Sequence, residues 1–375
     1  MNQSKALVML VVGQTPPPFG GQAILIESIL KGKYERLTLR HLRMSYSSGM
    51  AEVGRVNAGK VWHLIDLIWK TFLLRLEIGS AVLYYPPSGP DLVPMLRDIT
   101  YLLCTRWMFS GLVLHFHASG VSELVQRLNW PLRVLALLAY RGADCALSQS
   151  KYNPDDGLAL QAKKVIILPC GIPDEAIRFS KRDPGSDNRH RLLFVGVLCE
   201  AKGVLVLLDA VRLVIERGFE VELALIGEIA SETMRQELNR RLDAPPLRGR
   251  VRLTGELRGD DKWTEYRRAD VFCFPSFFPA ESFGLVAIEA MQFGLPVVAA
   301  RWRGLQSVVE DGSTGFLVPP GDADALAERI AHLLTNPALS AVMGARGRER
   351  YLREFTVEHY YRQLEESIVG VFLPP

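Results

Sequence analysis

The stretch that decides the fold of this chain is residues 279–290, which read PAESFGLVAIEA. Two glutamates, Glu281 and Glu289, stand eight positions apart in it. From Phe283 to Phe293 the residues are apolar on nearly every side, which is typical of a buried helix. A buried glutamate is rare unless another group pairs with it. The pattern therefore predicts that the two glutamates bind a polar partner.

The spacing of the two glutamates indicates the size of that partner. Eight helical residues span about 12 Å, which is close to the length of a sugar–diphosphate–ribose ligand. We expect Glu281 just before the helix and Glu289 two turns in. Between them lie the free amides of Phe283, Gly284 and Leu285, and amides at a helix N-terminus attract a diphosphate. The alternative is a capping glutamate followed by a core glutamate that the protein itself satisfies.

Three neighbouring segments extend the pattern, namely residues 270–276 (DVFCFPS), 294–299 (GLPVVA) and 311–318 (DGSTGFLV). Together they resemble the glutamate–seven–glutamate motif of the retaining GT-B glycosyltransferases, specifically glycosyltransferase family four (glycosyl transferases group 1). The resemblance is strong over residues 192–335 and thinner over the first half. It implies that Glu281 lies against the donor sugar near its anomeric centre, and that Glu289 accepts hydrogen bonds from the nucleotide ribose.

Short apolar runs alternate with helical patterns in both halves of the chain, as in parallel α/β layers. A chain of 375 residues favours two domains, and the polar, Gly/Pro-containing residues 179–189 predict the linker between them. The predicted strands are residues 6–12, 81–85, 112–116, 145–148 and 165–168, then 192–195, 221–226, 251–254, 271–274 and 297–299.

The resemblance implies an α/β fold of the GT-B class, with two Rossmann-like domains facing each other across a cleft. Ligands of such sheets bind at the carboxyl ends of the strands. We expect an acceptor-binding N-terminal domain over residues 1–180 and a nucleotide-sugar-binding domain over residues 190–352. Residues 353–375 are expected to form a final helix that returns to the N-terminal domain.

Composition describes an ordinary folded protein, with 48% hydrophobic and 23% charged residues. No apolar run reaches about 18 residues, which argues against a membrane-spanning helix. The five cysteines are scattered, show no metal-ligand spacing and suit free thiols in a reducing cytoplasm. We therefore predict a cytoplasmic protein.

Charge is divided unevenly along the chain. Residues 1–190 contain 22 Lys and Arg against 15 Asp and Glu, a net charge of +7, and the remaining 22 against 26 give −4. This excess is too small to indicate a nucleic-acid-binding protein. It would favour a phosphorylated acceptor or peripheral contact of the N-terminal domain with the anionic inner face of a membrane.

A glycine pair follows the first predicted strand. Residues 16–21 read PPPFGG, and Gly20 and Gly21 would let the backbone approach a ligand closely. In the family this loop reaches the donor diphosphate, which makes both glycines donor-binding candidates. A plain proline–glycine turn is the alternative.

Two histidines end a buried strand in the first half. His115 and His117 are one residue apart, so strand alternation places them on the same face. The family has a histidine here beside the donor sugar, and His117, nearer the loop, is our candidate catalytic residue. The alternatives are a core histidine or a paired-histidine metal site, but no carboxylate at ligand spacing supports a metal.

The segment from Phe194 to Gly203 predicts a strand, a loop and the start of a helix. The family pattern has an arginine after the first glycine and a lysine before the second, and both neutralise the donor phosphates. Lys202 is present, whereas Val197 stands where the arginine is expected. Charge-assisted hydrogen bonds are among the strongest in a site, so Arg301 or Arg303 substitutes, or the donor is bound more loosely.

Two further patterns have competing interpretations. Asp322 and Asp324 resemble a metal-binding pair, but their context predicts a helix N-terminus with acidic capping residues, and we expect no metal. The helical patterns over residues 61–76 and 124–140 combine apolar faces with arginines, which suits core-facing helices or interfacial membrane contact.

The resemblance implies a retaining glycosyltransferase, and the absence of a convincing metal cluster in the sequence predicts that it is metal-independent and needs no cofactor. Its partners would be a nucleoside-diphosphate-sugar donor and a glycan, lipid-linked or small-molecule acceptor. The second hypothesis for the function is a nucleotide-sugar epimerase or hydrolase on the same fold. A weakly active donor-binding subunit of a glycosylation complex is the third, because Val197 departs from the family pattern.

Overall fold

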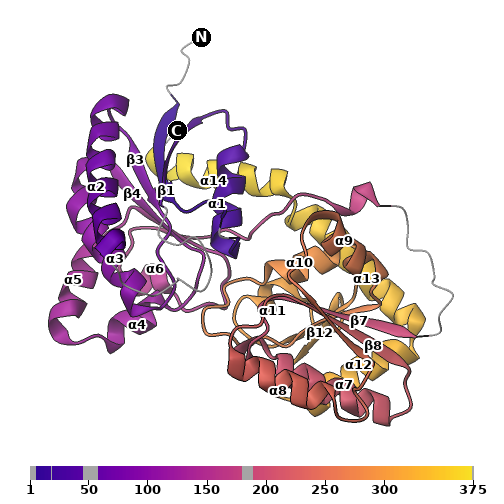
Figure 1. The fold of residues 1–375 in the computed structure, drawn as a ribbon. Coiled ribbons are helices and arrows are strands. Elements are labelled where there is room, and N and C mark those ends of the chain that lie inside the picture. The colour runs from indigo at the N-terminus through magenta and orange to yellow at the C-terminus, as the bar shows by residue number, and fades with distance from the viewer. Residues whose placement is uncertain (1–5, 18, 45–57, 180–188, 374–375) are drawn as a thin grey trace. The chain divides into compact units, whose positions relative to one another are not determined.

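The computed structural model describes residues 6–17, 19–44, 58–179 and 189–373, which form two compact units (Figure 1). Unit 1 comprises residues 1–171 and 357–375, and unit 2 comprises residues 172–356. The units divide after Gly171, ahead of the linker predicted over residues 179–189. Residues 180–188 of that linker lie outside the described ranges.

Unit 1 is built on a parallel sheet in the order β2-β1-β3-β4-β5-β6. Its strands are β1 (Leu7–Gly13), β2 (Leu37–Arg43), β3 (Val82–Tyr85), β4 (Gly111–Phe116), β5 (Cys145–Ser148) and β6 (Val165–Ile167). The sequence pattern missed β2, whose residues LTLRHLR are mostly half-buried or exposed. An edge strand needs apolar residues less than the fully buried central strands do, so its periodicity is weak.

Helices cover both faces of this sheet. On one face α1 (Gly21–Lys31) and α14 (Val357–Phe372) share a core with the strands, in which Leu364 and Ile368 are fully buried. The other face is covered by α2 (Ala58–Ile78), α3 (Leu92–Thr105), α4 (Val121–Arg127) and α5 (Trp130–Tyr140). The short α6 (Asp156–Ala159) precedes β6. The final helix therefore completes unit 1, as the resemblance implied.

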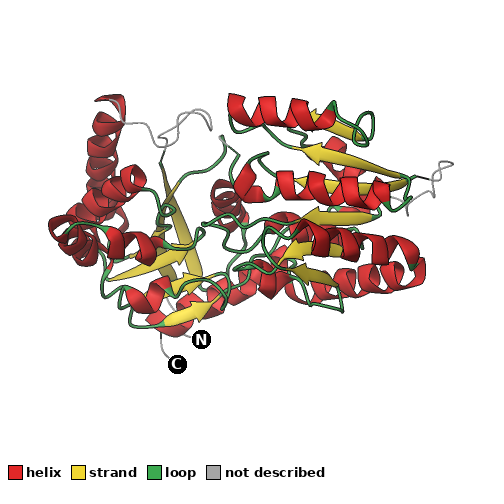
Figure 2. Cartoon of the chain, turned by 90° about the horizontal axis from the view of Figure 1, so that it is seen from below, coloured by secondary structure: helices red, strands yellow, loops and turns green. Residues whose placement is uncertain are grey.

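Unit 2 has a second parallel sheet in the order β12-β11-β10-β7-β8-β9. Figure 2 shows it as a stack of strands flanked by helices. Its strands are β7 (His190–Val195), β8 (Val221–Ile226), β9 (Val251–Gly255), β10 (Val271–Phe274), β11 (Val297–Ala300) and β12 (Gly315–Val318). Its helices are α7 (Val204–Glu216), α8 (Glu232–Leu242), α9 (Gly259–Arg268), α10 (Leu285–Gln292), α11 (Leu305–Val308), α12 (Ala323–Thr335) and α13 (Pro337–Glu354).

Strand order in each sheet reverses once, and ligands of open α/β sheets bind at such reversals. In unit 2 the chain runs outward from β7 to β9 and then resumes at β10 on the other side of β7. In unit 1 the reversal lies between β1 and β3. The loops after β7 and β10, and those after β1 and β3, are therefore the places to look for a site.

Helix α10 begins two residues later than the sequence predicted. Gly284 is its N-cap and has a left-handed backbone, φ 87°, so the helix starts at Leu285. A β-carbon on Gly284 would lie 2.4 Å from Leu305 Cδ2, which explains why glycine is needed there. Phe283 consequently precedes the helix, and Glu289 is about one turn in, rather than two.

Candidate functional site

The first pair of charged side chains lies at the strand reversal of unit 2. Lys202 ends the 3-10 turn η4 (Glu200–Lys202) after β7, and Glu281 lies in the loop after β10. Lys202 Nζ is 2.7 Å from Glu281 Oε2. The buried hydroxyl of Ser276 donates to the same oxygen at 2.9 Å. The sequence singled out Lys202 and Glu281 separately, and the structure joins them in one ion pair.

Close backbone packing brings these two loops together. The amide of Phe277 donates to Ala201 O at 2.9 Å. Gly203, φ 76°, leaves no room for a side chain, because a β-carbon would lie 2.1 Å from Pro275 O. Both the left-handed backbone and the close approach require glycine. The loop geometry therefore fixes the ion pair, rather than the flexible lysine side chain alone.

The surroundings of Lys202 strengthen its electrostatic role. Its ammonium lies 4.8 Å from the ring centre of Phe278 and 5.5 Å from that of Phe274, within cation–π range. Only 19% of the lysine side chain and 9% of that of Glu281 are exposed. An ammonium has three donors, so Lys202 can contact Glu281 and an anionic ligand together.

Glu289 has partners that sequence reasoning missed. Its Oε1 is 2.6 Å from Lys262 Nζ, and its Oε2 accepts from the Tyr266 hydroxyl at 2.7 Å. Both partners lie one turn apart on α9, and Lys262 also lies over the ring of Trp263. This arrangement satisfies the carboxylate within the protein, yet each oxygen keeps a further lone pair for a ligand hydroxyl.

The N-terminus of α10 lies between the two glutamates in sequence. Its first amides, including that of Leu285, have no acceptor within the helix. The segment before it packs tightly, because a β-carbon on Gly304 would lie 2.0 Å from Ser282 O. Glu281, Ser282 and Phe283 are buried. A rigid, anion-favouring helix start therefore follows directly after the Lys202–Glu281 pair.

Val197 lies in the loop after β7, directly after Gly196, with 37% of its surface exposed. Arg301, a predicted substitute for the missing arginine, is bound elsewhere. Its Nη2 is 2.5 Å from Asp311 Oδ2 and 3.3 Å from Leu317 O. Those acceptors lie on the β12 side of β11, away from β7 in the sheet. Arg303, φ 37°, has its guanidinium 5.5 Å from the ring centre of Trp302.

Unit 1 has a hydrogen-bonded cluster of uncharged side chains at the carboxyl ends of its strands. The Tyr84 hydroxyl lies 2.6 Å from His115 Nδ1 and 3.2 Å from His117 Nε2. Gln149 Nε2 lies 3.0 Å from His117 Nδ1, and the two imidazoles stack with ring centres 4.0 Å apart. The amide nitrogen of Gln149 donates, so Nδ1 of His117 accepts and Nε2 bears the proton.

Burial keeps both histidines neutral. It lowers the pKa of His117 to about 3. It also lowers the pKa of His115 well below the ordinary value, and His117 adds to that shift. The buried Nε2 of His115 has no hydrogen-bond partner among the described residues. Near neutral pH this cluster can therefore donate hydrogen bonds but supplies no positive charge.

The glycine loop of unit 1 is fixed from the edge strand. Arg43, the last residue of β2, donates to the carbonyls of Thr15, Pro16 and Pro17 at 3.1–3.2 Å. Pro18 lies outside the described residues. Gly20 is the N-cap of α1 with an extended backbone, φ −109°, and a β-carbon on it would meet nothing within 4 Å. Packing therefore does not require glycine at position 20.

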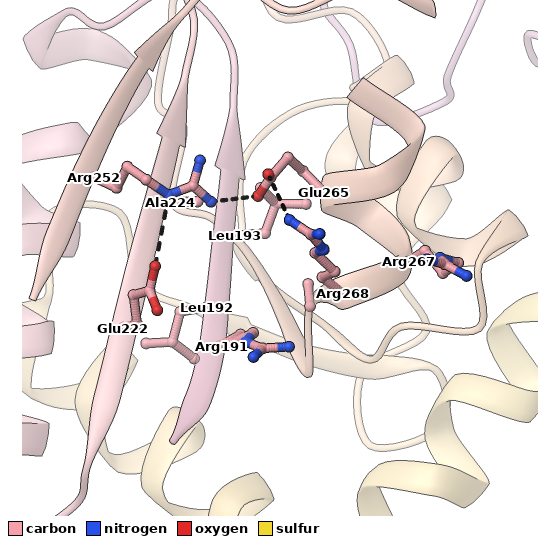
Figure 3. A pocket seen from close by; sticks show the side chains of 10 residues that line it. Arg191, Leu192, Leu193, Glu222, Ala224, Arg252, Glu265, Arg267 and Arg268 are labelled. Atoms are coloured by element: carbon pink, nitrogen blue, oxygen red, sulfur yellow. Dashed lines mark hydrogen bonds and ion pairs between the residues drawn. The ribbon is translucent and has the colours of Figure 1, made fainter. Parts of the chain in front are cut away.

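A separate hollow in unit 2, drawn in Figure 3, has a different character. It measures about 500 Å³ and lies at the amino ends of β7, β8 and β9. Figure 3 shows Arg252 between two glutamates, with its guanidinium 2.6 Å from Glu265 and 3.6 Å from Glu222. Arg268 is in the last turn of α9, where a cation complements the helix dipole. Because this hollow lies at the amino ends of the strands, it is separate from the predicted ligand site at the strand reversal, where ligands bind at the carboxyl ends.

Asp322 caps α12, because its Oδ1 accepts from the amide of Ala325 at 2.9 Å. Among the residues that the structure describes, no group of three or more His, Cys, Asp or Glu side chains is placed to hold a metal ion. Within the same ranges, no helix is both long and apolar enough to cross a membrane.

Comparison with known proteins assigns unit 2 to a family. Residues 176–350 match the family model described as glycosyl transferases group 1. Unit 2 is a group 1 glycosyltransferase domain. The ion pair at its strand reversal, the start of α10 and Glu289 all lie inside the matched range.

Curated relatives match this chain over part of their length. A phosphatidyl-myo-inositol mannosyltransferase of Mycobacterium leprae is 38% identical over 162 residues, which cover 43% of this chain and 39% of the relative. The capsular polysaccharide biosynthesis glycosyltransferase CapM of Staphylococcus aureus is 29% identical over 221 residues, 56% of each chain. The chain thus spans about half or less of the length of these curated relatives.

Solved structures match nearly the whole chain and show its fold. HepE of Anabaena, in complex with UDP and glucose, gives a TM-score of 0.72 at 20% identity, covering 96% of this chain and 99% of HepE. Sucrose-phosphate synthase of Thermosynechococcus elongatus gives 0.73 at 20% identity, covering 98% and 100%. The chain has the GT-B fold, with a parallel sheet in each unit and a C-terminal helix that returns to unit 1.

Proposed function

We propose that this protein is a retaining glycosyltransferase that moves a sugar from a nucleoside diphosphate to a glycan, lipid-linked or small-molecule acceptor. The observation that carries the proposal is the Lys202–Glu281 pair at the strand reversal of a group 1 domain. It brings a cation for a leaving diphosphate within 2.7 Å of a carboxylate that can face a positively charged anomeric carbon. Relatives that transfer mannose, and neighbours solved with UDP, support the same reading.

The roles of the donor-binding residues follow from the charges that develop in the reaction. As the bond from the anomeric carbon to the phosphate oxygen breaks, negative charge grows on the diphosphate. Lys202 and the amides around Gly284 and Leu285 stabilise that charge. Glu281 faces the positive sugar ring, and Glu289, oriented by Lys262 and Tyr266, accepts from the ribose hydroxyls. The acceptor oxygen bonds the anomeric carbon from the same side, and its proton passes to the leaving phosphate.

Unit 1 would supply neutral side chains and bind the acceptor. His117, fixed by Tyr84 and Gln149, would be an uncharged imidazole beside the sugar, and the loop at Gly20 and Gly21 would approach the diphosphate. No residue role in this scheme needs a metal or a cofactor, so we propose a metal-independent reaction. Free thiols, three of them buried with a raised pKa, suit a cytoplasmic location.

A donor panel tests the function directly. Thermal unfolding would be followed with nucleoside diphosphates and their sugars, because a ligand that binds the folded state raises its stability. Product analysis with and without an acceptor, and with excess chelator, would follow for the donor that binds. We expect transfer with retained anomeric configuration that survives the chelator. Inverted product, or loss of turnover that magnesium or manganese restores, would contradict the retaining or metal-independent part.

The same assay separates the competing functions. An epimerase or hydrolase would consume donor fully without any acceptor, whereas a transferase would not. A donor-binding subunit would bind the nucleotide sugar without turning it over. The observation that favours this alternative is the exposed Val197, at the turn where the family pattern has a phosphate-binding arginine. Lys202→Ala is the negative control for donor binding, and Arg252→Ala in the hollow of Figure 3 is the matched positive control.

A further inference from the structure

One helix of unit 1 is apolar on the side turned away from the core. This helix is α2, whose residues Leu67 and Thr71 face the core and are fully buried. Yet its outward side bears exposed large apolar residues, namely Val61, Trp62, Ile65, Trp69, Leu73 and Leu76. A helix that is apolar all round is normally buried in a protein core or in lipid. The outer side of α2 therefore needs an explanation that the fold of unit 1 does not give.

Elements near α2 also bear exposed apolar side chains. Figure 1 shows α2, α3 and α5 lying side by side on one face of the sheet, and α3 contacts both of the others. Trp130, Leu135 and Leu138 of α5 are exposed. Trp107, in the 3-10 turn η2 (Arg106–Met108), is 71% exposed. We call this outer surface of α2, η2 and α5 the apolar face.

Tryptophans are concentrated on this face. Four of the six tryptophans in the chain lie there, and each exposes between 59% and 78% of its surface. Tryptophan is favoured where an apolar body meets a polar, hydrated layer, as at a membrane surface. Scattered single apolar residues are ordinary on a protein surface, whereas a contiguous patch marks an interaction site.

The turn that presents Trp107 is rigidly built by two arginines. Arg75 of α2 donates to Met108 O at 2.7 Å. Arg106 donates to the carbonyls of Leu138 and Ala139 at the end of α5, at 3.1 and 2.7 Å. These bonds attach the turn that presents the exposed Trp107 to both α2 and α5.

Charge on these helices also favours an anionic partner. Residues 58–141 contain eight lysines and arginines against five aspartates and glutamates. Two of those acids are paired with bases of the same segment, Asp66 with Lys70 and Asp98 with Arg97, each at 2.7 Å, so the excess of positive charge remains. Basic residues near an anionic bilayer add attraction that salt screens. A row of neighbouring helices rather than a groove holds the exposed side chains, which suits a flat occupant.

We propose that the apolar face of unit 1 binds the surface of an anionic lipid bilayer, with the tryptophans of α2, η2 and α5 inserted at the headgroup level. The protein would lie on the membrane without crossing it. The inference rests on unit 1 alone and stands whether or not unit 2 transfers sugar. If both hold, the acceptor-binding unit is the one held at the lipid surface.

Vesicle flotation of the full chain, without any nucleotide sugar, tests this. Wild type would be compared on phosphatidylcholine vesicles and on mixed phosphatidylcholine–phosphatidylglycerol vesicles, at low and high salt. We expect binding to the anionic vesicles, weakened by salt, with a blue shift of tryptophan emission. Absent binding to anionic vesicles, or equal binding to neutral ones, would overturn the proposal.

Paired variants locate the surface. The double substitution Trp62→Glu with Trp69→Glu should lower the vesicle partition coefficient by about 100-fold, because each buried apolar side chain contributes about a factor of ten. Trp107→Ala should lower it by about tenfold. The matched control, Val342→Glu with Leu352→Glu on the exposed side of α13, should bind as wild type does.

Two outcomes would contradict the assignment. If the tryptophan variants keep their circular dichroism spectrum and unfolding midpoint and still float as wild type does, the face is wrong. If wild type is a stable dimer in sedimentation, and Trp62→Glu with Trp69→Glu makes it a monomer without affecting flotation, the face binds a second copy instead. Folded variants that no longer float, beside a control that does, would support the proposal.

Discussion

The two units treat polar side chains at their strand ends in opposite ways. Unit 2 places full charges there in pairs, Lys202 with Glu281 and Lys262 with Glu289. Unit 1 has a neutral cluster of hydrogen-bonded side chains there, centred on His117. Burial lowers the pKa of His117 to about 3. A charged pair can rearrange around a diphosphate, whereas a neutral cluster can only donate or accept hydrogen bonds. The comparison predicts that charge changes will act strongly in unit 2 and that acidity will act through unit 1.

The largest effect should come from splitting the charged pair. Lys202→Ala leaves the carboxylate of Glu281 buried without its cation, and Glu281→Ala does the reverse. Breaking a buried ion pair costs about 3–5 kcal/mol, so each variant should lose about that much unfolding free energy and most donor affinity. The double variant should lose clearly less than the sum, as expected for contacting residues. Denaturant unfolding measures all three, and additive losses would show that the pair is not coupled.

Adding a positive charge in unit 2 should raise donor affinity, whereas splitting the ion pair should lower it. Arg301 is held by Asp311 on the β12 side, and Val197 is a partly exposed apolar residue in the loop after β7. Val197→Arg should tighten nucleoside diphosphate binding by about 1.5–3 kcal/mol, the value of a hydrogen bond to a charged group. Calorimetry against the parent measures it, with Val197→Leu as the uncharged control. Unchanged affinity would mean that Arg303 or another cation already serves the phosphates, as the sequence suggested.

Acid should act through the histidines of unit 1. Both are neutral in the folded protein because burial lowers their pKa, whereas in the unfolded chain they protonate near pH 6.5. Their contribution to stability is therefore complete above about pH 6.5 and is lost progressively as pH falls toward the folded value. For His117, the loss should be about 2 kcal/mol at pH 5. Unfolding from pH 7.5 to 5 in wild type and His117→Gln measures it, and identical slopes would contradict the assignment.

The smallest effect on stability is expected at the glycine loop. Gly20 has a backbone that alanine adopts readily and open space around its missing β-carbon. Gly20→Ala should leave the unfolding free energy level or raise it by up to about 1 kcal/mol, while weakening donor binding several-fold. Gly284→Ala is the contrasting control, because its left-handed backbone and the neighbouring Leu305 make glycine structural. If Gly20→Ala binds donor normally, the loop is a plain turn.

The sequence predicted the features that depend on local pattern. Lys202, Glu281 and Glu289 each belong to a short motif that follows a strongly apolar strand. The spacing of the two glutamates and the resemblance to a family pattern singled them out. Their partners could not be found that way. Lys262 and Tyr266 precede Glu289 by more than 20 residues on a polar helix, and only the crossover of α9 brings them close.

Backbone conformation and edge position explain the other differences. The start of α10 shifted because the left-handed turn at Gly284 depends on Leu305, which a local pattern does not reveal. Edge strand β2 was missed because most of its residues are half-buried or exposed, so its apolar pattern is weak. The hydroxyl of Tyr84 joins the two histidines across neighbouring strands β3 and β4, and strand order is not written in spacing.

Helix α14 has a consequence for how this chain folds during synthesis. Its residues Tyr360, Leu364 and Ile368 fill the core beneath β1 and β3, yet they are made after all of unit 2. Domains usually fold in order as they leave the ribosome, but unit 1 cannot close its core until residues 357–372 emerge. The first unit to begin folding is therefore the last to finish. A premature stop after unit 2 would leave unit 2 intact and expose the apolar core of unit 1 to aggregation.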